Sequence, residues 1–80
     1  MKTVWILTWE FAGQGKYGKL ISGVFANEKD AIDAMGSIKK RFRGTGTVTI
    51  DASDEYEIFV RGMVNYYGVE QCQVFEGEAR

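Results

Sequence analysis

The sequence contains no histidine, no proline and a single cysteine, Cys72. One cysteine cannot form an intramolecular disulfide, and without histidine the chain has neither a Cys/His zinc site nor a Ser/His or Cys/His catalytic pair. We therefore expect no metal, no cofactor, no catalytic residue and no enzymatic activity. Cys72 lies in an expected strand, where it is interpreted as a small apolar residue.

Eighty residues are enough for one domain, which we expect to span 1–80. The core of so short a chain contributes about 3 to 5 kcal/mol of net stability. A homodimer is one way of stabilising it further. The apolar run after Lys2 has only about six residues, too few for a signal peptide or a membrane span. We expect a cytoplasmic protein with no membrane partner.

The charges are unevenly distributed, although the net charge is only −1. Residues 1–50 contain eight basic and four acidic residues, whereas 51–80 contain two basic and seven acidic residues, giving net charges of +4 and −5. Two interpretations stay open. The two halves attract each other within the fold, or the charged surfaces face a partner.

Hydrophobic periodicity predicts six elements in the order ββαβαβ. The fold class is α+β: a single small domain with a four-stranded mixed sheet and two helices. Whether both helices cover one face of the sheet stays open; if they do, the uncovered face carries large apolar residues and marks a partner or dimer surface. The expected strands are 2–10, 20–25, 47–52 and 69–75, the expected helices are 28–43 and 54–67, and glycine-rich 12–18 is expected to be an irregular hairpin loop.

The first expected helix has clear start and packing signals. Asn27 is expected to be its N-cap, with the side-chain oxygen accepting from the first free amides. Ala31, Met35, Ile38 and Phe42 recur at helical spacing and predict its buried face.

The segment 54–67 has two interpretations. The preferred one is a helix that leaves Ile58 outside its buried stripe. Because residues that favour strands are frequent here, a hairpin with a strand at 56–61 is the alternative. The stripe of the expected helix consists of Tyr56, Val60, Met63 and Tyr67.

The expected hairpin loop supplies candidate partner contacts: Phe11, Lys16, Tyr17 and Lys19. Aromatic and cationic groups on an adaptable backbone are typical of binding loops. Residues 13–19 also match the start of the P-loop pattern. A leucine follows in place of the Ser/Thr hydroxyl, and a strand follows in place of a helix N-terminus, so we interpret the match as accidental.

Asp51, Asp54, Glu55 and Glu57 form an acidic group. Such residues suit the start of a helix, the binding of a divalent cation through oxygen ligands, or contact with a basic partner surface. We keep them as candidate partner contacts and expect no metal.

The first expected helix ends in four cations beside a glycine turn: Lys39, Lys40, Arg41 and Arg43. Clustered cations attract nucleic acid, although cations at a helix C-terminus also interact favourably with the helix dipole. Binding of nucleic acid or a nucleotide by this cluster, with Lys16 and Lys19, is the alternative function.

The overall organisation resembles that of small phage-encoded anti-defence proteins, including anti-CRISPR inhibitors. The features that carry it are one compact domain, a strand that starts almost at Met1, the strand-to-helix junction at 23–31 and no catalytic set. The resemblance covers the whole chain and is one of style, with no functional residues to carry over. It implies inhibition by occupying the surface of a host protein in the host cytoplasm.

The leading hypothesis is accordingly a non-enzymatic protein-binding module. Its expected partner is a host protein or complex that processes nucleic acid. A dimeric structural accessory protein is a further alternative to this function and to nucleic-acid binding.

Overall fold

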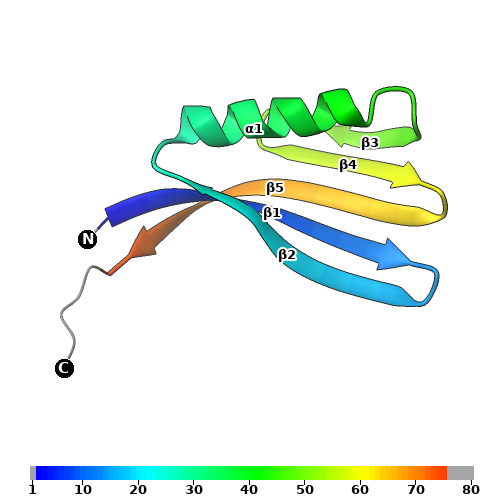
Figure 1. Ribbon diagram of the computed structural model, residues 1–80, viewed down its shortest axis with the longest axis horizontal. Helices are drawn as coiled ribbons and strands as arrows, with labels where there is room; N and C mark the ends of the chain where they lie inside the picture. The colour runs from blue at the N-terminus through cyan, green and yellow to red at the C-terminus, as the bar shows by residue number, and fades with distance from the viewer. Residues whose placement is uncertain (1, 76–80) are drawn as a thin grey trace.

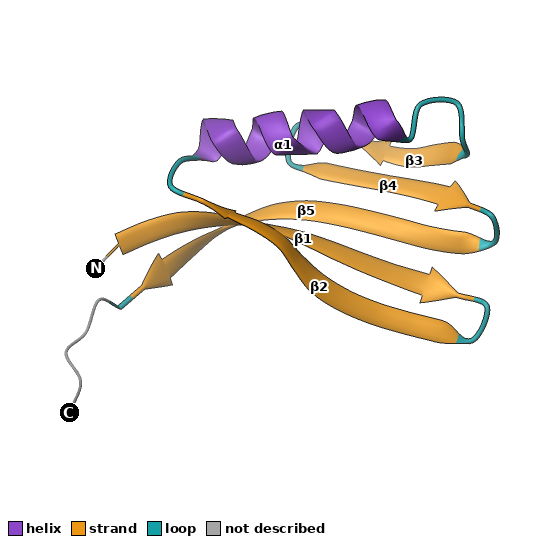
Figure 2. Ribbon diagram, in the orientation of Figure 1, coloured by secondary structure: helices purple, strands orange, loops and turns teal. Residues whose placement is uncertain are grey.

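The computed structural model describes residues 2–75 and contains one helix and one five-stranded antiparallel sheet (Figures 1 and 2). The strand order across the sheet is β2-β1-β5-β4-β3, and the helix packs on one face. The elements are β1 (Lys2–Gly13), β2 (Lys16–Phe25), α1 (Glu28–Arg41), β3 (Thr47–Asp51), β4 (Glu55–Val60) and β5 (Met63–Val74).

The expectation of a four-stranded mixed sheet with two helices is wrong. The segment 54–67 forms β4, a tight turn and the first part of β5, as the hairpin alternative had it. The turn is made by Arg61 and Gly62, with φ values of 52° and 78°. Two successive positive φ angles are typical of type I′ turns, whose twist matches that of the strands they join. Ile58, expected outside the core, is fully buried.

The hairpin of β1 and β2 is also tighter than expected. Its two-residue turn consists of Gln14 and Gly15, with φ values of 53° and 76°, so the strands extend through most of 12–18. The turn contacts the β4–β5 turn, since the Gln14 side chain donates a hydrogen bond to the Arg61 carbonyl. A Cβ on Gly13 would lie 2.5 Å from the Gly62 carbonyl oxygen. The tips of the two hairpins therefore pack together.

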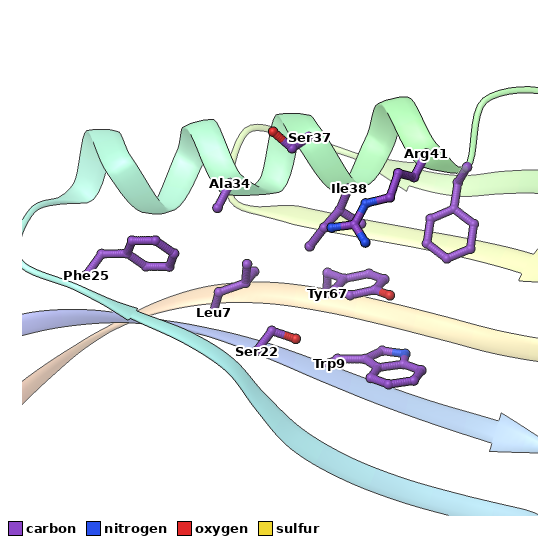
Figure 3. Close-up of a pocket in the computed structure, with 10 residues that line it drawn as sticks. Leu7, Trp9, Ser22, Phe25, Ala34, Ser37, Ile38, Arg41 and Tyr67 are labelled. Atoms are coloured by element: carbon purple, nitrogen blue, oxygen red, sulfur yellow. The ribbon is translucent and has the colours of Figure 1, made fainter.

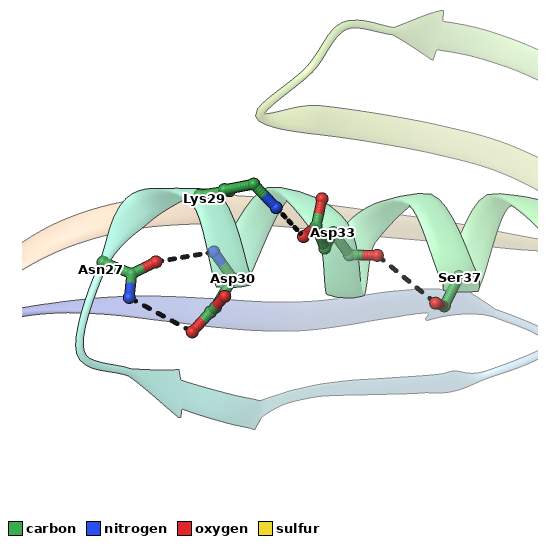
Figure 4. A network of polar contacts seen from close by, with 5 residues as sticks. All are labelled: Asn27, Lys29, Asp30, Asp33 and Ser37. Carbon is green, nitrogen blue, oxygen red and sulfur yellow. Dashed lines mark hydrogen bonds and ion pairs between the residues drawn. The ribbon is translucent and has the colours of Figure 1, made fainter.

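The predicted start of α1 and most of its predicted buried face are confirmed, although the helix ends at Arg41, before the expected end at residue 43. The Asp30 backbone N–H donates to the Asn27 side-chain oxygen at 2.9 Å, which makes Asn27 the N-cap (Figure 4). Ala31, Met35 and Ile38 are buried, and Phe42 follows as the C-cap, partly buried against the core. No helix within residues 2–75 combines the length and apolar character that crossing a membrane requires.

The core lies between α1 and one face of the sheet. Met35 and Ile38 of the helix pack against a cluster of buried strand residues. Because side chains alternate along a strand, these strand residues face the same way in the observed register. They are Leu7, Tyr56, Ile58 and Tyr67.

Candidate functional site

Within residues 2–75, α1 covers one face of the sheet and no element covers the other, which we call the open face (Figure 1). The strand register arranges its side chains in rows that run across the sheet. One row is mostly apolar, and the next contains carboxylates. The first consists of Tyr17, Ala12, Val64, Phe59 and Thr47, and the second of Lys19, Glu10, Tyr66, Glu57 and Ile50.

Two further rows continue the mixture of apolar and acidic side chains. Large apolar groups are well exposed in this region, with 64% of Ile21 and 48% of Phe59 accessible to solvent. Exposed apolar side chains that extend over several strands are typical of interaction surfaces. The rows consist of Ile21, Thr8, Gly68 and Glu55, and of Val24, Ile6 and Glu70.

The carboxylates of the open face accept hydrogen bonds from hydroxyl groups. The Tyr17 hydroxyl donates to Glu10 Oε2 at 2.6 Å, and the Tyr66 hydroxyl donates to Glu55 Oε1 at 2.8 Å. Thr49 Oγ1 donates to the carboxylate of Glu57 at 2.8 Å. A hydroxyl donor orients a carboxylate without neutralising it, so the negative charge of the face is retained.

The pKa of Tyr66 is raised by burial and by this negative charge. Burial and the hydrogen bond to Glu55, together with the charges of Glu55, Asp54 and Glu10, raise its pKa to about 12. The hydrogen bond to Glu10 and the charge of that carboxylate likewise raise the pKa of Tyr17. Both phenols therefore stay neutral as hydrogen-bond donors at physiological pH.

Attraction between the two halves of the chain explains little of the charge asymmetry. Two ion pairs occur among the described residues: Lys29 with Asp33 at 2.8 Å, and Lys39 with Asp51 at 2.7 Å. Only the second joins the basic half to the acidic half. Lys19 lies opposite Glu10 in the strand register but makes no ion pair within 2–75.

A cleft of about 250 Å³ lies near the hairpin tips and collects several of these groups. Two carboxylates and two phenols contribute to it, so it combines hydrogen-bonding groups with aromatic surface. Its lining residues are Glu10, Phe11, Ala12, Tyr17, Glu57, Val64 and Tyr66.

The structure brings together half of the expected hairpin contacts. Tyr17 and Lys19 lie on the open face, but Phe11 and Lys16 pair with Gly18 and Gly13 on the helix side of the sheet. The Phe11 ring is 5.1 Å from that of Trp9, a neighbour of the core.

The acidic group is also divided. Glu55 and Glu57 lie on the open face, whereas Asp51 pairs with Tyr56 on the helix side and Asp54 lies in the β3–β4 loop. Across the described part of the chain, no three His, Cys, Asp or Glu side chains are grouped so as to hold a metal ion. The helix-start interpretation is wrong, because this segment begins a strand.

Three of the four cations after residue 38 share one cleft, and the fourth lies elsewhere. Lys39 is engaged with Asp51, the Ala52 carbonyl oxygen at 2.6 Å and the ring of Tyr56. Lys40 and Arg43 line a cleft with Lys39, while Arg41 lines a different groove. Asp51, which pairs with Lys39, also lines this cleft and reduces its positive charge, which weakens the case for a nucleic-acid site there.

Sequence reasoning missed Glu10, Tyr66 and Phe59. Glu10 had a local signal, since it is a carboxylate within an apolar strand. Tyr66 and Phe59 had none, because their positions depend on pairing between β1, β5 and β4. The chain matches no protein-family model, and no match was found among curated proteins or solved structures.

Proposed function

We propose that this chain is a non-enzymatic protein-binding module whose open face binds a basic and partly apolar surface of another protein. The observation that carries the proposal is that two rows of side chains lie next to each other on the open face. The acidic row contains Glu10 and Glu57, and the exposed apolar row contains Tyr17 and Phe59. Apolar contact supplies affinity, and complementary charge supplies specificity and speed of association.

The apolar row and the acidic row would contribute to binding in different ways. Tyr17 and Phe59 offer large rings that lose little conformational freedom on binding, which is typical of residues that dominate interface energies. Glu57 in the acidic row and Glu55 in the row beside it carry negative charge without an ion-pair partner in 2–75. A lysine- or arginine-rich partner would compensate that charge.

The finer proposal concerns the kind of partner. Basic surfaces are typical of proteins that bind nucleic acid. We propose that the partner belongs to a host complex that processes nucleic acid, and that a phage-encoded chain inhibits it by occupying its basic surface. The charge of the open face and the resemblance in style support this proposal.

The test compares Glu57→Lys with Asp33→Lys, because each raises the net charge by two units. The exposed side chain of Asp33 lies on α1, on the other side of the sheet from the open face, and so Asp33→Lys is the matched control (Figure 4). Phe59→Ser tests the apolar row. Each variant is used to capture proteins from a nuclease-treated host lysate, and binding to the purified captured protein is then measured by calorimetry.

Glu57→Lys and Phe59→Ser should each weaken binding at least about tenfold, while Asp33→Lys leaves it within about twofold. Raising the salt concentration should weaken the wild type more than Glu57→Lys. Equal affinity of all three variants would contradict the proposal. So would capture by the wild type from untreated lysate that is absent from nuclease-treated lysate.

A further inference from the structure

A groove of about 610 Å³ lies on the other side of the sheet, between α1 and strands β1, β2 and β5 (Figure 3). Aromatic and aliphatic side chains form most of it. Ligand sites are typically concave, mostly apolar and of about 300 to 1,000 Å³. Its large apolar lining residues are Leu7, Trp9, Phe25, Ile38, Phe42 and Tyr67.

On the β2 side, the groove is lined by the Phe25 ring, which lies over Gly23. Gly23 pairs with Leu7, and the register then shifts by one residue, which places Ser22 in a β-bulge. Gly23 has no side chain and is covered by the Phe25 ring, whereas Ser22 lines the groove. Ser22 adds a hydroxyl group to the floor of the groove (Figure 3).

Among the described residues that line the groove, Arg41 alone is charged. Its guanidinium group points from α1 into the groove, toward Tyr67 (Figure 3). Burial raises the pKa of Tyr67, and the positive charge of Arg41 opposes that rise, as expected of a nearby cation. Arg41 forms no ion pair with any carboxylate in residues 2–75.

We propose that this groove binds a small apolar anion, with an aromatic or aliphatic body and one carboxylate or sulfonate group. The body packs between Trp9, Phe25 and Phe42, which are otherwise only partly buried. The anionic group accepts hydrogen bonds from Arg41, whose planar fork suits an oxyanion. This site is separate from the open face and does not depend on the protein-binding proposal.

Two fluorescent probes test the charge requirement. 8-Anilinonaphthalene-1-sulfonate carries the sulfonate, and N-phenyl-1-naphthylamine has the same aromatic body without it. Arg41→Gln should weaken sulfonate binding about tenfold and leave the neutral probe nearly unchanged. The matched control Arg43→Gln removes the same charge from a residue that lines a different cleft, so both affinities should stay the same.

The location is tested with the two tryptophan indole signals in a nitrogen-15 NMR spectrum. Trp9 Nε1 donates to Asn65 Oδ1 at 3.1 Å beside the groove, so its signal should shift with the sulfonate probe much more than that of Trp5. Phe59→Ser, on the open face, should leave the affinity unchanged. Equal binding of both probes by wild type, or no effect of Arg41→Gln, would overturn the proposal. Loss of binding in Phe59→Ser would overturn it as well.

Discussion

The two faces of the sheet are built from alternate residues of the same strands, yet one face is buried and the other is exposed to solvent. Ile58 is completely buried, whereas Phe59, the next residue, is 48% exposed. Both are strong strand formers, so propensity does not distinguish them. The difference is that α1 places Met35 and Ile38 over one face. The open face instead combines apolar groups with carboxylates, which keep it hydrated.

The largest expected effect tests this contrast directly. Ile58→Ala should lower the free energy of unfolding by about 2 to 5 kcal/mol, because it leaves a cavity in the core. Phe59→Ala should lower it by less than about 1 kcal/mol, although it removes more atoms. Urea denaturation followed by circular dichroism measures both changes.

Ile58→Val provides a milder version in case Ile58→Ala does not fold. It should cost about 0.5 to 1.5 kcal/mol. If Phe59→Ala proved as destabilising as Ile58→Ala, the open face would be a second packed surface in solution, and the contrast between the faces would fail.

Tyr66 and Tyr67 extend the contrast to ionisation. Carboxylates contribute to the raised pKa of Tyr66, about 12, whereas no carboxylate contributes to that of Tyr67. Glu55→Gln should therefore lower the pKa of Tyr66 and leave that of Tyr67 unchanged. Absorbance at 295 nm as a function of pH, with Tyr66→Phe to assign the signal, measures this shift. An unchanged titration in Glu55→Gln would mean that Glu55 does not help to hold the proton.

The same pKa makes stability depend on pH. An unfolded tyrosine loses its proton near pH 10, whereas folded Tyr66 keeps it to about pH 12. Its contribution to stability is therefore complete below pH 10 and is lost as the pH rises toward 12. In Tyr66→Phe, the fall of unfolding free energy over this interval should be smaller than in wild type.

Local signals allowed α1 to be predicted, and their ambiguity caused the error at 54–67. Asn27 and the spacing of Ala31, Met35 and Ile38 fit only a helix. Tyr56 and Val60, by contrast, are four residues apart and also alternate with Ile58 in a strand. The turn at 61–62 lacks the Asn-Gly pair that usually signals a hairpin. Arg61 stands at the position where Asn is preferred, and it adopts the positive φ angle that the turn requires.

The candidate site was predictable in chemistry but not in arrangement. The sequence predicts Tyr17, Glu55 and Glu57 as candidate contact residues from their chemistry and position. Their common face depends on β5 lying between β1 and β4, a pairing of residues about 60 positions apart. Such long-range register leaves no local trace in one sequence.

The helix that creates the covered face can be weakened at its start. Asn27→Ala removes the side-chain oxygen that accepts from the Asp30 N–H. We expect a loss of about 1 kcal/mol in the free energy of unfolding, as for other N-caps. Asn27→Asp restores an acceptor and should recover most of that stability in the same urea titration. A neutral effect of Asn27→Ala would show that packing alone holds the first turn.

The smallest expected effect has the opposite sign. Gly36 lies within α1, and a Cβ placed there meets no described atom outside this helix within 4 Å. Because glycine costs a helix about 1 kcal/mol relative to alanine, Gly36→Ala should stabilise the protein by about 0.5 to 1 kcal/mol. The contrasting variant Gly13→Ala should destabilise it, since its Cβ would meet the Gly62 carbonyl. A higher urea midpoint for Gly36→Ala would confirm that the stability of α1 limits the stability of the covered face. An unchanged midpoint would mean that strand pairing sets this limit.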